Sequence, residues 1–282
     1  MRTPRIGFLL PRSHCTRYSS SHMAMVLRTL AQAGAVVDII YPTEQAIDLS
    51  AVRVEHDLYV HRKMSGLAFS LAAALHRQGA VIVNPYPVSA ALRDKIVASR
   101  VLQGAGVPIP PTYVAATLDQ LVPLLDDGPL IVKPYQGAGG HDVRVVHTAA
   151  ELVPAQTPDH APVFAQRYLR PDGRDRKIYA IGDHFFGVKK VFPQLTEADR
   201  QGEPFTLTPE QREIAGRCGR AFGAELYGVD IIESEGRPYV VDMSSIPGYK
   251  GVPDAPRLLA EYFYAAAERA ARGEPALQEA LA

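Results

Sequence analysis

The stretch YGVDIIESEGRPYVVDMSS, residues 227–245, constrains the fold most. Two apolar runs, each with one aspartate, flank the polar turn ESEGRP, which predicts a β-hairpin. Asp242 follows Asp230 by twelve positions, so we expect both acids on paired strands, on one face of the sheet. Two close buried carboxylates repel unless one is protonated or a cation bridges them, and Mg²⁺ completed by phosphates is a natural bridge. The alternative is that both acids cap nearby backbone or pair with lysines.

The first part of the chain alternates between strand-like and helix-like patterns. The runs RIGFLL, AVVDIIYP, DLYVH and VIVNPYP predict four strands, and residues 19–34 and 65–79 predict two helices. Such alternation favours a parallel α/β unit over residues 1–88, with a border near PYPVS at 85–89. No GxGxxG motif follows the first strand, which argues against a dinucleotide-binding domain.

The rest of the chain has an α+β pattern. RKIYAIGDHFFGVKK predicts a second hairpin with Gly-Asp at its turn. SAALRDKIVASRVLQGAG predicts one helix that holds Lys95 in its middle, and a capping box of Thr117 and Gln120 opens TLDQLVPLLDDG. Thr208 with Pro209 predicts the start of another helix, and DAPRLLAEYFYAAAERAARG predicts a closing one.

A glycine-rich loop follows the strand LIVKPY. Lys133 ends that strand, and the loop glycines allow backbone N–H groups to approach an anion; they are Gly137, Gly139 and Gly140. The loop joins two strands, so it is not of the Walker type, which enters a helix. A flexible hairpin loop with a solvated lysine is the alternative. His141 directly follows the loop and is a candidate catalytic residue, although a lone histidine is more often structural.

Lysines of the second hairpin are further candidates for chemistry. We expect Lys177 and Lys189 to project into a shared cleft, where they would bind phosphate or carboxylate oxygens. The alternative is that these lysines face solvent and protect a sheet edge.

Charge and cysteine content narrow the class of protein. Lys plus Arg and Asp plus Glu both number 30, so nothing in the charge balance indicates a nucleic-acid or membrane partner. Cys15 and Cys218 are far apart, which predicts neither a disulfide framework nor a zinc site. No run of about 18 apolar residues occurs. We expect a cytoplasmic protein, and a homo-oligomer stays open.

Five motifs in order resemble the ATP-grasp superfamily, and within it the RimK-like carboxylate–amine ligases. They are RDKIVASRVLQGAGVPIPPTYV, LIVKPYQGAGG, FAQRYL, GRDRKIYAIGD and GVDIIESEGRPYVVDMSSIPGYKG. The resemblance implies an ATP-grasp fold of α/β and α+β parts. Its divisions would be a Rossmann-like N-terminal domain at 1–88, a central subdomain at 89–165 and a C-terminal subdomain at 166–282. ATP would lie between the last two.

The resemblance also implies a role for each motif. Lys95 and Lys133 would hold the α- and β-phosphates of ATP, and the glycine loop would cover the β- and γ-phosphates. Lys177 would lie near the transferred phosphoryl group. The residues that contact adenine would be Gln166, Arg167, Tyr168 and Leu169. The ligands of Mg²⁺, or of Mn²⁺ in its place, would be Asp230, Asp242 and Ser244.

The chain departs from the family pattern at four positions. The family has Glu, Asn, Gly and Arg where this chain has Asp242, Ser244, Asp142 and Lys177. Ser244 and Asp142 are the departures that would favour a non-catalytic nucleotide-binding module.

A rival within the same fold comes from GGHDV, GRDRKIYAIGDH, VKK and IPGYKG, which resemble inositol polyphosphate kinases of the ATP-grasp type. The residues that match the kinases are His141, Lys177, Lys189 and Tyr249. Two enzymatic functions therefore stay open. One is a ligase that joins a small-molecule carboxylate and an amine through an acylphosphate, and the other is a kinase that phosphorylates a hydroxyl, as on a polyol phosphate. In either, we expect the acceptor cleft beside the N-terminal domain, with Arg62 and Lys63 on its far wall.

Overall fold

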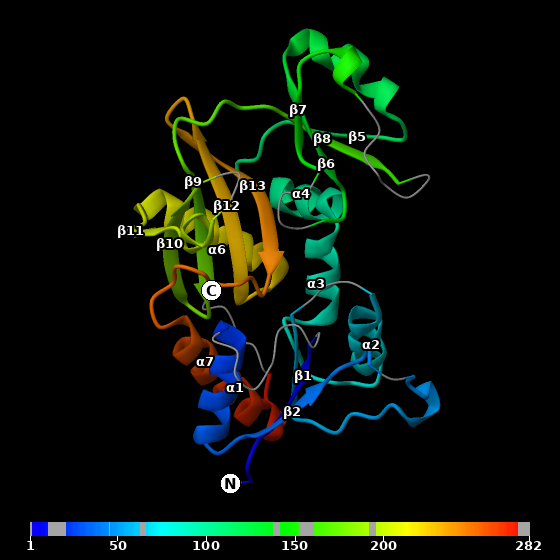
Figure 1. Cartoon of the computed structure of the whole chain (residues 1–282), viewed down its shortest axis with the longest axis vertical. Helices are drawn as coiled ribbons and strands as arrows, with labels where there is room; N and C mark the ends of the chain where they lie inside the picture. Colours follow the sequence, from blue (N-terminus) through cyan, green and yellow to red (C-terminus); the bar gives the residue numbers. More distant parts are fainter. Residues whose placement is uncertain are drawn as a thin grey trace.

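Three β-sheets follow one another along the long axis of the molecule in the computed structural model (Figure 1). The structure describes residues 2–10, 21–44, 46–62, 66–137, 142–152, 161–191 and 196–275. The first sheet lies at the bottom of Figure 1, the third in the middle and the second at the top. The mixture of α/β and α+β parts expected from the sequence is confirmed.

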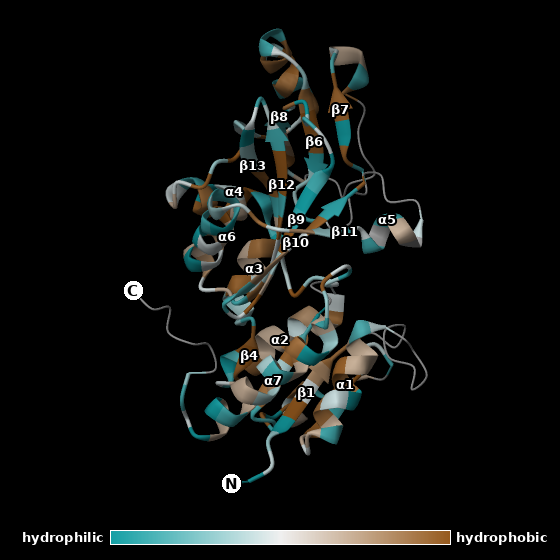
Figure 2. Ribbon diagram, turned by 90° about the vertical axis from the view of Figure 1, so that its left-hand side faces the viewer, coloured by the Kyte–Doolittle hydropathy of each residue, from teal (hydrophilic) through white to brown (hydrophobic). Residues whose placement is uncertain are grey.

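The first sheet is parallel and has the strand order β2-β1-β3-β4. Its elements are β1 (Arg5–Leu9), α1 (His22–Gln32), β2 (Val36–Ile40), the 3₁₀ helix η2 (Leu49–Ala51), β3 (Leu58–His61), α2 (Gly66–Arg77) and β4 (Ile82–Val83). The Ser21 hydroxyl caps α1 by accepting a hydrogen bond from the Ala24 N–H at 3.3 Å. Figure 2 shows β1 as a hydrophobic strand near α1, α2 and α7.

The junction after β4 differs from the sequence-based prediction in two ways. The predicted strand VIVNPYP keeps only two strand residues, because Pro85 caps a helix, α3 (Tyr86–Arg93). The single helix expected at 89–106 is two helices, α3 and α4 (Lys95–Gly104). The break lies at Asp94, whose carboxylate accepts hydrogen bonds from the Ile96 and Val97 N–H groups at 2.9 and 3.2 Å. Lys95 is therefore the first residue of α4 and does not lie in the middle of a helix.

The second sheet is antiparallel, in the order β5-β8-β6-β7. Its elements are β5 (Thr112–Ala115), η3 (Leu118–Asp127), β6 (Leu130–Pro134), β7 (Arg144–Val146), η4 (Ala149–Glu151) and β8 (Val163–Arg167). The capping box predicted before η3 is wrong, because the Thr117 side chain makes no capping bond. Gln120 instead accepts a hydrogen bond from the Ala116 N–H at 2.9 Å.

The third sheet contains both predicted hairpins, in the order β11-β10-β9-β12-β13. Its elements are β9 (Asp175–Ile181), β10 (His184–Lys190), α5 (Glu197–Gln201), β11 (Glu203–Phe205), α6 (Pro209–Phe222), β12 (Leu226–Ser234) and β13 (Arg237–Ser245). Thr208 and Gln211 cap α6 reciprocally, as the Thr-Pro start predicts. Buried side chains of α6 pack on one face of the sheet, which leaves the other face for chemistry.

The closing helix α7 (Ala255–Ala271) returns to the first sheet and packs beside α1 (Figure 1). Phe263 of α7 meets Phe8 of β1 edge to face, with ring centroids 5.8 Å apart. The border proposed at residues 88 and 89 falls within α3, and the division into 1–88, 89–165 and 166–282 stays a proposal. Within the described ranges, no helix is long and apolar enough to cross a membrane.

Candidate functional site

Three charged side chains form a row across the third sheet. Asp230 of β12 lies opposite Asp242 of β13 on one side and opposite Lys177 of β9 on the other. Directly opposed residues of antiparallel strands share a face, so the register places both acids and the lysine on the same surface. Asp230 and Asp242 are 32% and 34% exposed, so their carboxylates remain open to a ligand. The prediction that the two acids lie on paired strands is confirmed.

Lys177 and Asp230 form the central ion pair of this row. The Lys177 Nζ donates to both carboxylate oxygens of Asp230 at 2.8 Å. Burial lowers the pKa of Lys177, but the charge of Asp230 opposes burial, and together with neighbouring groups it leaves the pKa raised. Lys177 therefore remains an ammonium ion at neutral pH.

A β-bulge next to Asp242 joins the third sheet to the second. Asp230 pairs with Asp242 but Ile231 pairs with Val240, so Val241 is the extra residue. The Val241 carbonyl accepts a hydrogen bond from the Lys133 Nζ at 3.1 Å. Lys133 lies on β6 of the second sheet, and its Nζ also donates to the Gln166 side chain at 2.8 Å. The bulge thus brings the second sheet's lysine beside the acids.

Lys133 is buried, at 8% exposed. Burial lowers its pKa to about 8, and the charge of Lys95 acts in the same direction. The carboxylates of Asp242, Asp230 and Asp175 oppose this shift. A second cation and three acids are therefore close enough to influence one another.

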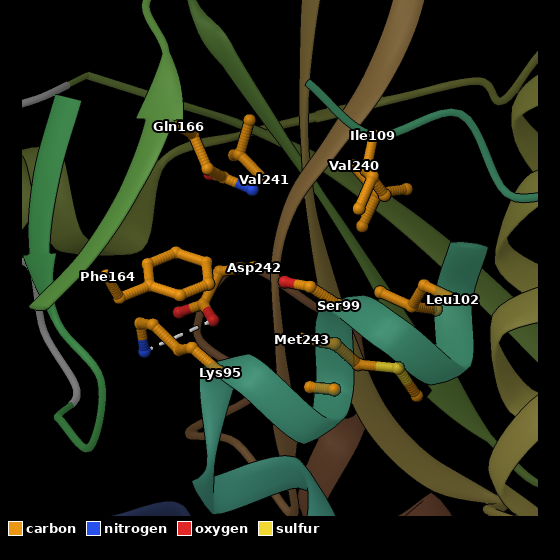
Figure 3. A pocket seen from close by; sticks show the side chains of 11 residues that line it. Lys95, Ser99, Leu102, Ile109, Phe164, Gln166, Val240, Val241, Asp242 and Met243 are labelled. Carbon is orange, nitrogen blue, oxygen red and sulfur yellow. Dashed lines mark ion pairs between the residues drawn. The ribbon is translucent and has the colours of Figure 1, made fainter. Parts of the chain in front are cut away.

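Lys95 lies between the start of the glycine loop and Asp242. Its Nζ donates to the Gly137 carbonyl at 2.9 Å and lies 3.4 Å from an Asp242 carboxylate oxygen. In Figure 3 the Lys95 side chain points toward Asp242, and the Phe164 ring lies beside this pair. The pocket shown there is lined by Lys95, Ala98, Ser99, Leu102, Ile109, Phe164, Gln166, Val240, Val241, Asp242 and Met243.

Ser244 presents a buried hydroxyl group on the same face as the acids. Its Oγ has no hydrogen-bond partner among the residues that the structure describes. Ser244 lies opposite Gly228, where a Cβ atom would come within 3.3 Å of the Ser244 Oγ and 3.0 Å of the Lys177 Cε. The absence of a side chain at Gly228 lets these groups approach each other.

The donor set fits a hard divalent cation that also takes oxygen ligands from a substrate. Two carboxylates and an orphaned hydroxyl are oxygen donors of the kind that Mg²⁺ prefers. In the described part of the chain, no group of three or more His, Cys, Asp or Glu side chains could hold a metal by itself. A Mg²⁺ ion here would therefore need phosphate or water oxygens to complete its shell.

Asp175 belongs to this face, although the sequence reasoning did not select it. It precedes Lys177 by two residues on β9, so both side chains point to the same side. Burial raises the pKa of Asp175, and the negative charge of Asp230 adds to this, while Lys133 lowers it. The two-residue spacing from Lys177 was the signal that could have identified Asp175.

The expectation that Lys177 and Lys189 share a cleft is wrong. Lys177 lies opposite Val188, whereas Lys189 lies opposite Arg176, so the two lysines point to opposite faces of the sheet. The Lys189 Nζ lies 5.8 Å from the centre of the Phe205 ring. Lys190 is the lysine of β10 that shares a face with Lys177, and its Nζ donates to the Gln201 and Lys250 carbonyls at 3.3 and 3.2 Å.

The four residues expected to contact adenine begin at the end of β8. Gln166 is 2% exposed and links Lys133 to the Thr112 hydroxyl. The Arg167 guanidinium donates to the carbonyls of Gly128 and Leu124, and therefore holds β8 against η3.

The backbone of this segment is partly engaged. The N–H groups of Arg167 and Tyr168 donate to Pro111 and Pro129 at 2.8 and 3.0 Å, and Leu169 comes next. Of the remaining candidates, Gly139, Gly140, His141 and Lys63 lie outside the described residues.

Comparisons with known proteins match most of the chain. A family model described as "RimK-like ATP-grasp domain" matches residues 92–256. A "Probable alpha-L-glutamate ligase" of Citrobacter koseri is 28% identical over 232 residues, 76% of this chain and 77% of that protein. A "Ribosomal protein bS6--L-glutamate ligase" of Escherichia fergusonii has the same identity and coverage.

Solved structures share the fold at low sequence identity. A RimK domain protein from Sphaerobacter thermophilus has a TM-score of 0.72 and 18% identity, over 91% of this chain and 98% of that one. The D-cycloserine synthetase DcsG has a TM-score of 0.70 and 18% identity, over 94% and 99%. The ligase PsnB, complexed with a minimal precursor, Mg and ADP, has a TM-score of 0.63 and 15% identity, over 89% and 91%.

Proposed function

The chain belongs to the RimK-like ATP-grasp family and has the ATP-grasp fold, and we propose that it is an ATP- and Mg²⁺-dependent carboxylate–amine ligase. The row of Lys177, Asp230 and Asp242 is the observation that carries this proposal. Lys95 and Lys133 of the neighbouring elements reach the same row. Relatives named as glutamate ligases support the C–N bond as the product.

Binding of ATP would rearrange the ion pairs of the free site. Lys95 contacts Asp242 and Lys177 contacts Asp230, so each acid has a lysine beside it. We propose that the phosphates take Lys95 and Lys133, while the acids and Ser244 hold the cation. When bound, Mg²⁺ would offset the negative charge of the phosphates.

The adenine ring would lie at the connection that follows β8. Gln166 and Arg167 use their side chains for contacts within the protein. The Arg167 and Tyr168 N–H groups are engaged as well. We therefore assign adenine recognition to the backbone carbonyls of this segment and to the Leu169 N–H.

The chemistry proceeds in two steps. The γ-phosphoryl group passes from ATP to a substrate carboxylate, which gives ADP and an acylphosphate. An amine then attacks the acyl carbon, the C–N bond forms, the bond to phosphate oxygen breaks, and the amine loses a proton. Lys177, which is paired with Asp230, would neutralise charge on the transferred group, since fixed ammonium ions stabilise phosphoryl transfer electrostatically.

The kinase alternative loses the feature on which it rested most. Tyr249 of the Pro-Gly-Tyr turn is 1% exposed, and its hydroxyl donates to the Ala180 carbonyl at 3.2 Å. The Tyr249 ring packs against Tyr179 with centroids 5.5 Å apart, so Tyr249 is a residue of the core. Lys189, the second feature, faces away from the acids. The product-mass experiment below therefore tests kinase activity as the alternative result.

Product mass distinguishes the candidate functions. The protein is incubated with ATP, Mg²⁺ and pools of amino acids, peptides and polyol phosphates. ADP with a product lighter than its two substrates by one water supports the ligase. A product heavier by one phosphoryl group supports the kinase, and ATP binding without ADP release supports a non-catalytic module.

The aspartate row has its own test. Asp242→Asn should abolish Mg²⁺-dependent turnover and leave the fold intact, whereas retained activity would refute the metal assignment. Asp126→Asn is the matched control, because Asp126 is an exposed aspartate at the far end of η3.

A further inference from the structure

A cluster of basic side chains surrounds the turn that follows β13. The His22 Nδ1 lies 3.2 Å from the Gly248 carbonyl oxygen. The Arg62 guanidinium approaches the same residue so closely that a Cβ on Gly248 would meet its Nη2 at 3.3 Å. Burial, followed by the charges of Arg62 and Lys250, lowers the pKa of His22, against the opposite effect of the Gly248 bond. The same Cβ would lie 4.0 Å from the Lys250 Cγ, so three basic residues from three separate segments lie together.

The cluster lies at the switch point of the first sheet. The strand order β2-β1-β3-β4 reverses direction between β1 and β3. His22 begins α1, the helix after β1, and Arg62 directly follows β3. Ligands of parallel α/β sheets bind at such reversals, beyond the carboxyl ends of the strands. The fold therefore places two of the three basic residues where a ligand is expected.

The cluster also adjoins the phosphoryl-transfer site. A Cβ on Gly228 would lie 3.0 Å from the Lys177 Cε and 3.1 Å from the Pro247 Cγ. Pro247 precedes Gly248, whose carbonyl contacts His22. One residue of the turn therefore separates the acid row from the basic cluster, a span that one amino acid can cover.

The turn itself is held in place by Lys190. Its Nζ donates to the Lys250 carbonyl at 3.2 Å and to the Gln201 carbonyl at 3.3 Å. Lys190 is 6% exposed, so these two hydrogen bonds lie inside the protein. The Lys250 backbone is thus anchored independently of its side chain, which reduces the ordering that a ligand would have to impose.

We propose that Arg62 and Lys250 bind the carboxylate of the amine-bearing substrate and so turn its amino group toward Lys177 and Asp230. His22, whose lowered pKa keeps it neutral at pH 7, holds the turn by donating to the Gly248 carbonyl. The inference rests on the ligase function proposed above. An Arg guanidinium matches a planar carboxylate through two parallel hydrogen bonds. The charges of Arg62 and Lys250 repel an ammonium group, whereas Asp175 and Asp230 attract one. The two ends of the site therefore match the two ends of an amino acid.

Calorimetric titration tests the subsite without requiring turnover. The full chain, with Mg²⁺ and a non-hydrolysable ATP analogue, is titrated with L-glutamate and with L-glutaminamide, in which both carboxylates are amides. We expect L-glutaminamide to bind at least about tenfold more weakly, because its neutral amides accept hydrogen bonds but form no ion pair with Arg62 or Lys250. Arg62→Gln should weaken L-glutamate binding by a similar factor and leave the ATP analogue's affinity unchanged.

Controls separate the subsite from general effects. Arg257→Gln is the matched variant, because Arg257 is an exposed residue of α7 that pairs with Glu261 on the same helix. It should bind L-glutamate within about twofold of the unaltered protein, as expected for a surface change. Lys250→Met is the second variant should Arg62→Gln fail to fold, because the Lys250 backbone contact does not depend on its side chain.

Two results would overturn the proposal: equal binding of L-glutamate by the unaltered protein and by Arg62→Gln, or no binding by the unaltered protein. Failure of the ligase function looks different. If L-glutamate binds in an Arg62-dependent way but no condensation product forms in any pool, the anion subsite stands and the ligase chemistry is rejected.

Discussion

Lys177 and Asp230 face one another across β9 and β12, and both Asp230 carboxylate oxygens lie 2.8 Å from the Lys177 Nζ. Asp242 lies on the other side of Asp230 with Lys95 beside it. The free site therefore balances two acids with two lysines. In the proposed complex, the phosphates of ATP would pair with the lysines and a divalent cation would pair with the acids, so binding would replace the lysine–aspartate ion pairs.

Lys177→Met should lower kcat/KM by at least about 100-fold, the usual cost of removing one group that stabilises transition-state charge. Lys177→Arg is the matched variant, since it keeps the charge and restores the residue that the family resemblance places there. It should stay within about tenfold of the unaltered protein. The measurement is initial ADP release with saturating Mg²⁺. A methionine variant within about threefold of the unaltered protein would remove Lys177 from the mechanism.

Lys133 should make ATP binding depend on pH. Its pKa is about 8 in the free protein because of burial, and phosphate binds the protonated form. Affinity for a non-hydrolysable ATP analogue should therefore be constant below pH 8 and fall as the pH rises above it, by up to about tenfold per unit. Lys133→Met should bind weakly at every pH. A flat profile from pH 7 to 9.5 in the unaltered protein would contradict this account.

The lowered pKa of Lys133 should also make the stability of the fold depend on pH. Stability should rise over the pH range in which affinity for the ATP analogue falls. The folded-state pKa of Lys133 lies below the ordinary value of 10.5, so the unfolded chain binds the extra proton between about pH 8 and 10.5. The Lys133 contribution therefore destabilises the fold below pH 8, and this cost declines as the pH rises through that window. Urea unfolding of the unaltered protein and Lys133→Met, compared at pH 7.5 and 9.5, measures the difference.

The hairpin acids were predictable from sequence because two local signals agreed. Apolar runs around Asp230 and Asp242 indicate strands, and ESEGRP indicates the turn between them. The pairing of the acids follows from that turn. The bulge at Val241 does not follow, because no residue type in VVDM marks an extra residue. Its consequence, the contact of Lys133 with the third sheet, was therefore available only from the structure.

The face on which Lys189 lies could have been deduced. The Gly-Asp turn pairs Ile181 with His184, and counting outward pairs Lys177 with Val188. Neighbouring residues on a strand point to opposite faces, so Lys189 points away from the face that Val188 and Lys177 share. Lys190 lies two positions after Val188 and therefore points to that face. Lys189 was selected as a site residue only for its charge, and the strand register shows that it lies on the opposite face. The division of α3 from α4 had a signal too, because Asp94 is a favourable helix cap.

Ser244→Ala tests the orphaned hydroxyl. A residue that only fills space would lose no hydrogen bond, so stability should be unchanged or slightly higher. If the hydroxyl holds the cation or its water, the Mg²⁺ concentration for half-maximal ADP release should rise by about tenfold. Unchanged Mg²⁺ dependence together with unchanged stability would exclude Ser244 from the metal site. Exposed Ser50→Ala is the matched control.

Asn84→Ala should destabilise the junction between the first and third sheets. Asn84 is fully buried, and its side-chain amide donates to the Leu226 carbonyl at 2.7 Å and to the Ser245 hydroxyl at 2.9 Å. Its carbonyl oxygen accepts from the Leu226 N–H at 3.3 Å, and Ser245 also contacts Ser89 of α3. Removing the amide leaves several buried groups unsatisfied, which should cost about 2–4 kcal/mol.

Urea unfolding measures this cost, with Thr29→Ala as the control. Thr29 makes one exposed bond to the Met25 carbonyl within α1, so its loss should change stability by less than about 0.5 kcal/mol. Ser245 follows Ser244 on β13, so a loosened junction should also raise the Mg²⁺ requirement of ADP release. An Asn84→Ala protein as stable as the control variant would show that apolar packing of α7 on the first sheet, and not this polar network, joins the two parts.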